Sequence, residues 1–148
     1  AFPWGDVVMA NVLLELLQSR FAWICLFTWF ICQLIKFVLH AVTKKKYDYG
    51  YFYRIVGGEM PSSHAAVVAA FATMVYLEQG MSLLFLTASL LAIIVVYDAI
   101  AFRRQLGAHA KVLNMLSKRI KLQERIGHEP EEVLAGVAIG IAMALLLY

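Results

Sequence analysis

Long apolar runs separated by short polar segments dominate the pattern of the chain. The first long run covers 21–43 and ends at three consecutive lysines at 44–46. Three further runs follow, at 62–79, 81–104 and 130–148. A helix needs about 20 residues to cross the hydrocarbon core of a bilayer. We therefore predict that each of the four runs is a membrane-spanning helix.

Two other segments predict helices that do not span. The segment 1–20 carries an apolar stretch that is too short to cross a bilayer, which indicates an interfacial or half-spanning helix. The segment 108–126 is basic and amphipathic, a pattern typical of a helix on the membrane surface. The expected fold is all-α: one integral membrane domain over residues 1–148, built as a bundle of about five to six helices.

Composition favours the same class. Of the 148 residues, 62% are hydrophobic and 16% charged, whereas a soluble domain is about half apolar and about a quarter charged. So apolar a chain is a poor fit for nucleic-acid binding. Cys25 and Cys32 lie in one predicted helix at a spacing that a disulfide does not bridge, and we expect both to be buried thiols.

The basic residues predict how the helices are oriented. Cytoplasmic segments carry an excess of Lys and Arg, so the lysines at 44–46 are placed in the cytoplasm, and Arg103 and Arg104 return to that side. Arg20 is then the only one of the 13 basic residues at the other face. The predicted location is the cell membrane. Polar groups from four helices converge on its cytoplasmic face: Lys36, Pro61 to His64, Asp98, Arg103, Arg104, His128 and Glu132.

The stretch Pro61-Ser62-Ser63-His64 stands where a helix is predicted to begin. The first N–H groups of a helix have no partner within it and form a natural anion site, to which serine hydroxyls can add donors. The same residues are also an ordinary helix start, because serine is a favoured N-cap, with His64 as an interfacial histidine. This segment alone leaves both interpretations open.

A second histidine cluster precedes the last apolar run. His128 and Glu132 are four residues apart and share a face if the helix begins early enough. A carboxylate beside a histidine holds its tautomer and stabilises the imidazolium, which leaves the other ring nitrogen free to attack phosphorus. The alternative is that Glu131 and Glu132 are first-turn acids of the kind that helices favour.

Three cations and one carboxylate complete the candidate site. Lys36 lies within a predicted span, where a charged residue is a functional candidate by default, although a lysine there can also extend to the interface. Arg103 and Arg104 match the geometry of phosphate oxygens, with Asp98 placed to orient one of them. The alternative for the arginine pair is a topology anchor.

Three blocks of residues stand in a recognisable order. They are Gly57-Gly58 with Pro61-Ser62-Ser63-His64; Tyr97-Asp98-Ala99, Arg103-Arg104, Gly107 and Ala110-Lys111-Val112-Leu113-Asn114; and Gly127-His128, Pro130, Glu132-Val133-Leu134-Ala135-Gly136 and Gly140. Together they resemble the divergent branch of the type-2 phosphatidic acid phosphatase family, within the acid phosphatase and vanadium-dependent haloperoxidase superfamily. The resemblance covers nearly the whole chain from Gln33 onward and implies a helical bundle like that of the type-2 phosphatidic acid phosphatases.

The resemblance also implies a role for each candidate. His128 matches the histidine that forms a phosphohistidine, His64 the acid that protonates the leaving group, and Glu132 stands where the family has aspartate. The implied phosphate-binding groups are Lys36, Ser62, Ser63, the Gly58 backbone, Arg103 and Arg104, with Asp98 in support.

The chain departs from the family pattern at two positions. The third motif of the superfamily has the form Ser-Arg-x5-His-x3-Asp. With His128 as its histidine, the arginine falls on Leu122, so Arg103, Arg104 or Arg125 has to take its place, and the sequence leaves that choice open. Glu59 lengthens the spacing between the glycine pair and Pro61.

The leading hypothesis is therefore a membrane phosphatase, a phosphoric monoester or anhydride hydrolase that acts on a lipid phosphate or pyrophosphate through a phosphohistidine. No metal or other cofactor is expected, and the expected partners are the lipid substrate and membrane lipids. A homodimer through Gly136 and Gly140, or through the first helix, is a further hypothesis.

Two alternatives stay open at the level of the sequence. The first is a lipid-phosphate-binding protein, flippase or scaffold that retains the anion pocket without catalysis. The second uses His64, His128 and Glu132 as a transition-metal site, since two histidines and a carboxylate form such sites. Arg103 and Arg104 disfavour the metal site because they add positive charge beside it.

Overall fold

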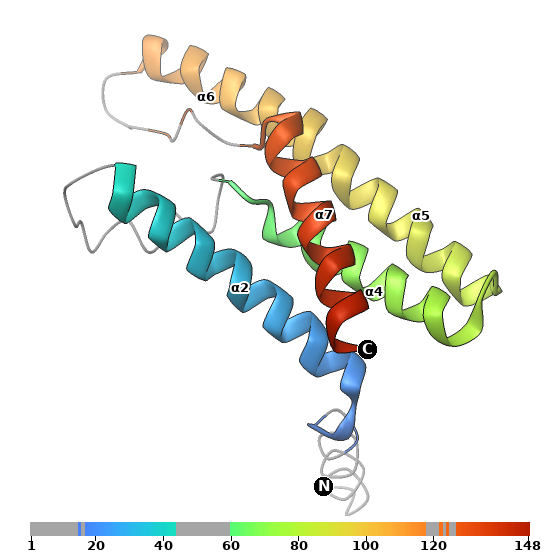
Figure 1. Ribbon diagram of the computed structural model, residues 1–148. Coiled ribbons are helices and arrows are strands. Elements are labelled where there is room, and N and C mark those ends of the chain that lie inside the picture. The colour runs from blue at the N-terminus through green and yellow to red at the C-terminus, as the bar shows by residue number, and fades with distance from the viewer. Residues whose placement is uncertain (1–14, 16, 44–59, 118–121, 123, 125–126) are drawn as a thin grey trace, which may run out of the picture.

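The computed structural model describes residues 15, 17–43, 60–117, 122, 124 and 127–148. The regular structure of these residues is helical. Its elements are α2 (Arg20–Thr43), α4 (Ser63–Gln79), α5 (Leu83–Tyr97), the π-helical segment η1 (Asp98–Phe102), α6 (Arg103–Leu116) and α7 (Pro130–Leu147). Because α5, η1 and α6 follow one another without a break, these residues form four continuous helices (Figure 1). The expected all-helical class is confirmed for them.

The expected number of five to six helices is wrong for the described residues. The segments 81–104 and 108–126 were predicted to be separate helices, but the backbone at Phe102 and Arg103 keeps right-handed helical angles and the two join into one rod over Leu83–Leu116. A charge pair does not interrupt a helix, since both arginines are good helix formers. Most of the predicted first helix, over 1–20, lies outside the described residues.

The rod ends earlier than the basic pattern predicts. Its last residue is Leu116, and Ser117 is extended, with φ −127° and ψ 117°. The Asn114 amide then holds the returning chain: its Oδ1 accepts from the Leu122 N–H at 2.8 Å, and its Nδ2 donates to the Leu122 carbonyl at 2.8 Å. Leu122 therefore lies back against Asn114 of α6 instead of continuing the helix.

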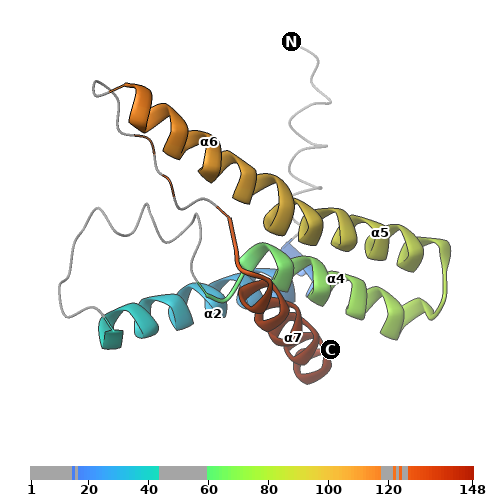
Figure 2. The same cartoon turned by 90° about the horizontal axis from the view of Figure 1, so that it is seen from above.

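The helix α4 is the central element. Its most extensive contact is with α7, and it also packs on α5 and α2, whereas α6 extends beyond the bundle (Figure 1, Figure 2). Two buried clusters mark the two ends of this packing. One cluster, formed by Ile24, Ala70, Met74 and Ala144, lies near the C-terminal end of α7. The other, formed by Ala65, Ala99 and Val133, lies where α4 and α7 begin.

Two glycines allow α7 to approach α4 at backbone distance. A Cβ atom on Gly136 would collide with the Ser62 carbonyl oxygen, and one on Gly140 with the Ala66 carbonyl oxygen. Small residues at helix contacts permit such close packing in membranes. The glycine face predicted as a dimer surface is therefore occupied inside the chain.

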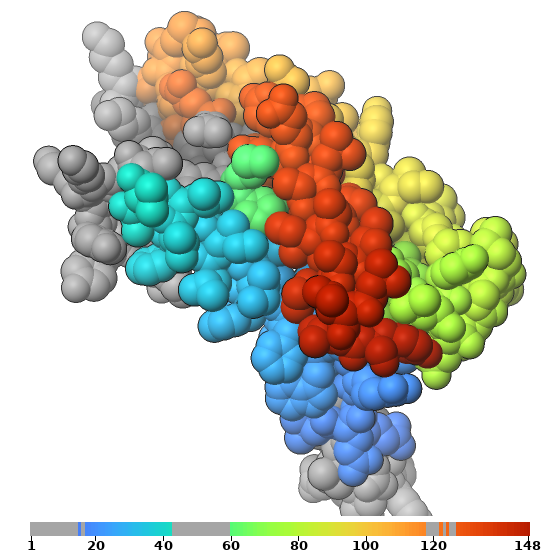
Figure 3. Space-filling model, viewed as in Figure 1, coloured from blue at the N-terminus to red at the C-terminus, as the bar shows by residue number. Residues whose placement is uncertain are grey.

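The outer surface fits a bilayer. Among the described residues, three helical stretches are long and apolar enough to cross a membrane, Arg20–Val42, Leu83–Leu116 and Pro130–Leu147, while α4 has 17 residues and is not among them. Large apolar side chains on the outside include Trp23, Phe30, Leu83 and Leu146. The space-filling view shows α2 and α7 side by side across one face (Figure 3). In water so much exposed apolar surface would be a liability, whereas lipid chains cover it.

Candidate functional site

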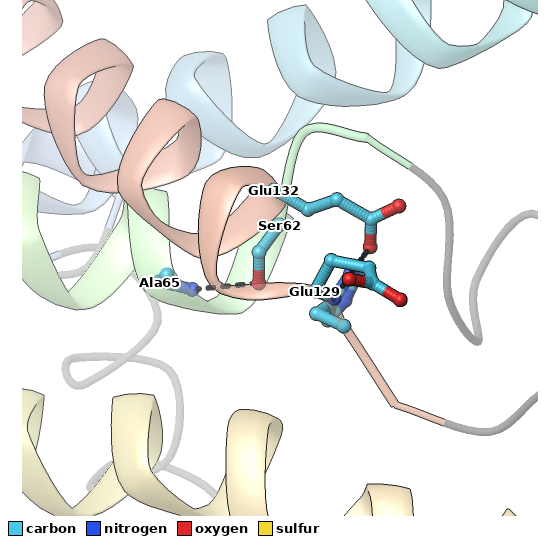
Figure 4. Close-up of polar contacts among 5 residues, drawn as sticks. Ser62, Ala65, Glu129 and Glu132 are labelled. Atoms are coloured by element: carbon cyan, nitrogen blue, oxygen red, sulfur yellow. Dashed lines mark hydrogen bonds and ion pairs between the residues drawn. The ribbon is translucent and has the colours of Figure 1, made fainter.

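The start of α4 is tied to the start of α7 through Ser62. This residue is fully buried and is the N-cap of α4, where its Oγ accepts from the Ala65 N–H at 3.4 Å (Figure 4). Its own N–H donates to the Glu132 carbonyl at 3.0 Å. The cap interpretation thus holds for the Ser62 hydroxyl, and the backbone bond brings the first and third sequence blocks together. Ser63, the first residue of α4, is also buried.

His128 and Glu132 form a buried pair. The Nδ1 atom of His128 lies 2.9 Å from Oε2 of Glu132, and the two residues are only 4% and 7% exposed. A carboxylate accepts only, so Nδ1 carries the proton that is donated to Glu132 and Nε2 keeps its lone pair in the neutral ring. The predicted i, i+4 contact is present, and the ring is held in the tautomer that a nucleophile at Nε2 requires.

Glu132 also caps its own helix. Its Oε2 accepts from the Glu129 N–H at 3.2 Å, while the Glu129 side chain accepts from the Glu132 backbone, which makes a capping box with Pro130 at the first helical position. Glu132 therefore both contacts His128 and serves as a first-turn acid of α7. Sequence reasoning missed Glu129, although a glutamate three residues before Glu132 and directly before a proline was a readable signal.

The loop before α7 rests on the π-helical turn. The His128 N–H donates to the Ala99 carbonyl of η1 at 3.2 Å. Gly127 has φ +103°, and a Cβ there would lie 2.8 Å from the Arg104 backbone nitrogen. Only glycine fits both the angle and the space. Single π turns recur at functional sites, and this one supports the backbone of His128; nothing in the sequence pattern signalled it.

The same π turn places Asp98 beside Arg103. The Arg103 Nε donates to Asp98 Oδ2 at 2.9 Å, and the two side chains keep 32% and 44% of their surface exposed. In a π-helix the fifth residue along lies over the first, so this pairing depends on the π geometry. The arginine is oriented but not enclosed, whereas Arg104 is exposed and its backbone nitrogen lies against Gly127.

The described cations and histidines act on one another electrostatically. The charges of Arg103, Lys36, His128 and Asp98 reach the exposed His64 at the start of α4, and those of Lys36 and Arg103 reach His128. Lys36 is only 1% exposed, so its side chain lies inside the protein. Groups from α2, α4, η1, α6 and the loop before α7 thus surround one region.

The charge state of His128 follows from its surroundings. Burial lowers its pKa below the ordinary 6.5, Lys36 and Arg103 act in the same direction, and the bond to Glu132 opposes them. A histidine with a lowered pKa is neutral at neutral pH. The ring is therefore present as a base with an available lone pair.

The predicted residues fall into three groups. One neighbourhood holds Lys36, Ser62, Ser63, His64, Asp98, Arg103, His128 and Glu132. The side chain of Arg104 is exposed beside it, and Gly58, Glu59 and Arg125 lie outside the described residues. Within the described ranges no three His, Cys, Asp or Glu side chains lie together as ligands for a metal ion, which removes support from the metal-site alternative.

Comparison with known proteins gives two matches. The model of a family described as the divergent PAP2 family matches residues 17–143. The chain is also similar to the uncharacterized membrane protein YuiD of Bacillus subtilis (strain 168), with 35% identity in an alignment that covers 78% of this chain and 85% of that protein. No solved structure matches the chain significantly.

Proposed function

Because this chain belongs to the divergent PAP2 family, we propose that it is a membrane phosphatase that hydrolyses a lipid phosphate or pyrophosphate through a phosphohistidine at His128, without a metal ion. The observation that carries the proposal is the buried His128–Glu132 pair. Its 2.9 Å contact commits Nδ1 to the carboxylate and leaves Nε2 as the nucleophile.

In the first step, Nε2 of His128 attacks phosphorus and the bond from phosphorus to the ester oxygen breaks. The bonding pair leaves with that oxygen, and a proton from His64 neutralises it, so the lipid departs as an alcohol or, from a pyrophosphate, as the monophosphate. Glu132 stabilises the positive charge that the His128 ring gains. Positioned acid and base groups of this kind contribute about 10²–10⁴-fold each.

Lys36 and Arg103 stabilise the charge that accumulates on the phosphoryl oxygens. Such stabilisation is stronger in a site that excludes water, and Lys36 is buried. Arg103 is the arginine that we assign to the position left open by Leu122, because its charge acts on both histidines and Asp98 orients it.

In the second step, water attacks the phosphohistidine. His64, now neutral, takes a proton from the water, the bond between phosphorus and Nε2 breaks, and inorganic phosphate leaves with the enzyme restored. The sum is one ester or anhydride plus one water giving phosphate and the alcohol or monophosphate. We place this site on the cytoplasmic face, from the distribution of lysine and arginine.

The test is phosphate release from lipid monophosphates and diphosphates by the purified protein. His128→Ala should lower the rate by at least about 10³-fold. Rapid quenching with a radiolabelled substrate should trap a base-stable label on the wild-type protein and none on His128→Ala. His109→Ala is the matched control, because His109 is an exposed histidine on α6 outside the site. An unchanged rate in His128→Ala would show that the mechanism is wrong.

A second substrate comparison tests His64. Loss of a general acid matters most when the leaving group is a poor one, so His64→Ala should slow an alkyl phosphate far more than an aryl phosphate. Equal slowing of both would contradict the assignment.

If the wild-type protein binds vanadate or phosphate but hydrolyses no phosphate ester, the chain is a lipid-phosphate binder instead.

A further inference from the structure

The amide of Gln33 is a buried polar group in the membrane-spanning part of α2. Its Oε1 and Nε2 atoms are closed to solvent and have no hydrogen-bond partner among the residues that the structure describes. Burying an amide without a partner is costly, and polar side chains inside membrane helices usually serve a substrate, an ion or a helix neighbour. The amide is therefore suited to bind a group that the protein itself does not supply.

Gln33 lies next to the phosphate-binding residue of the same helix. It precedes Lys36 by three residues, so the two share one face of α2 and are separated by about 4.5 Å along its axis. The charge of Lys36 reaches both His64 and His128. Gln33 thus lies one turn farther than Lys36 from the lysines at 44–46, on the hydrocarbon side of the phosphate site.

The chemistry of the amide indicates what it can bind. It offers donors at Nε2 and an acceptor at Oε1, whereas an ionised phosphate only accepts. A hydroxyl or an amide group uses both atoms. In a lipid whose phosphate is held at Lys36 and His128, the group on the hydrocarbon side of the phosphate is the linker that joins it to the chain.

We propose that Gln33 determines substrate specificity by hydrogen bonding a hydroxyl or amide group on the linker between the phosphate and the hydrocarbon chain of the lipid. The inference rests on the proposed function, because it takes the lipid phosphate at His128 as given. It adds a preference: lipid phosphates with such a group are favoured over lipid phosphates, such as polyprenyl phosphates, that have none.

A matched pair of lipids tests the preference. The first is a 1-acylglycerol 3-phosphate, and the second is the same molecule without its free hydroxyl. The wild type should prefer the first by about tenfold in kcat/KM, as expected for one buried hydrogen-bonded group. Gln33→Met, which keeps the length of the side chain, should remove the preference and leave hydrolysis of the second lipid unchanged. Leu34→Met, at an exposed position of the same helix, should change neither lipid.

Binding separates this inference from the proposed function. Dissociation constants of both lipids are measured with His128→Asn, alone and combined with Gln33→Met. If the hydroxyl preference appears in binding but the wild type hydrolyses nothing, the proposed function fails and the role of Gln33 stands. If the wild type hydrolyses both lipids equally, or if the preference survives in Gln33→Met, the role of Gln33 is overturned. Failure of both lipids to bind also overturns it.

The melting temperature of the lipid-free protein gives an independent readout. An amide without a partner contributes nothing to the fold, so Gln33→Met should not lower it. A clear drop in Gln33→Met but not in Leu34→Met would show that the amide is structural and would overturn the proposal.

Discussion

The two sides of the candidate site are built in opposite ways. On one side, His128 and Glu132 are buried at the start of α7, the helix that packs on α4 at backbone distance through Gly136 and Gly140. On the other, the rod of α5, η1 and α6 presents Arg103, half-exposed and held by Asp98. His128, the proposed nucleophile, is thus positioned by the same packing that makes the fold, while Arg103 is positioned by one ion pair and one π turn. Changes in the first region should affect fold and activity together, and changes in the second should affect activity alone.

The largest expected effect comes from filling the contact between α4 and α7. Gly140→Leu places a side chain where even a Cβ meets the Ala66 carbonyl, and overpacking of this kind costs about 1–3 kcal/mol or more. We expect loss of the folded protein, measured by melting temperature and by yield in detergent. Ala138→Leu, at an exposed position of the same helix, is the control. A stable Gly140→Leu protein with full activity would contradict the packing described for this contact.

The next effect concerns Glu132, which both contacts His128 and caps α7. Glu132→Gln keeps the size of the side chain but removes the charge that holds the His128 tautomer, and we expect the rate of phosphate release to fall by about 10³-fold. The same change removes a negative charge near the N-terminus of α7, which should lower stability by about 0.3–1 kcal/mol. Glu131→Gln, an exposed first-turn neighbour, should lower neither quantity much. A normal rate in Glu132→Gln would show that the 2.9 Å contact is structural only.

Substitutions in the rod of α5, η1 and α6 should lower the activity without a matching loss of stability. Arg103→Ala should lower kcat by about 10²-fold, as loss of one charge-stabilising group does, whereas Arg104→Ala should have a much smaller effect. Asp98→Asn should fall between them, because Arg103 remains but loses its orientation. Kinetics of the three variants with one lipid phosphate provide the measurement. If Arg104→Ala proves the more damaging change, the assignment of Arg103 is wrong.

The smallest effect is the pH dependence of stability. Burial holds the folded-state pKa of His128 below the ordinary 6.5, so the unfolded chain takes up a proton first as the pH falls. The contribution of the neutral ring to stability is therefore fully present when the pH is above the ordinary pKa of 6.5. It is lost as the pH falls through 6.5 toward the folded-state pKa. Melting temperatures between about pH 7.5 and about pH 5.5 should show this loss, and His128→Gln should reduce it. An identical pH profile in His128→Gln would assign the loss to other groups.

Much of the local structure could be predicted from the sequence. The apolar runs predicted helices whose observed bounds, such as Ser63–Gln79 and Pro130–Leu147, lie close to the predicted ones, because membrane helices are specified by residues near one another in the chain. The i, i+4 contact of His128 with Glu132 was predicted for the same reason. Membership of the divergent PAP2 family, expected from three short blocks, is confirmed.

Other features depend on backbone geometry that the sequence pattern did not indicate, and they were missed. The continuation of α5 into α6 depends on the π turn, which pairs Asp98 with Arg103 and accepts the His128 N–H at Ala99. The reversal after Leu116 depends on the Asn114 amide. Neither has a periodicity to read, since each involves one side chain or one carbonyl that meets a partner brought in by the rest of the fold.

The sequence by itself determined the class of the protein, its family and the positions of most of its helices, because hydrophobic period, helix caps and motif spacing are local properties. Only the tertiary structure decided which of the candidate residues meet. The glycines that looked available for a partner chain are used between α4 and α7, and Arg103 rather than Arg104 lies beside Asp98. For the glycines the physical reason is that close packing admits only one register of two helices. For the arginines it is the π turn, which places the fifth residue along over the first.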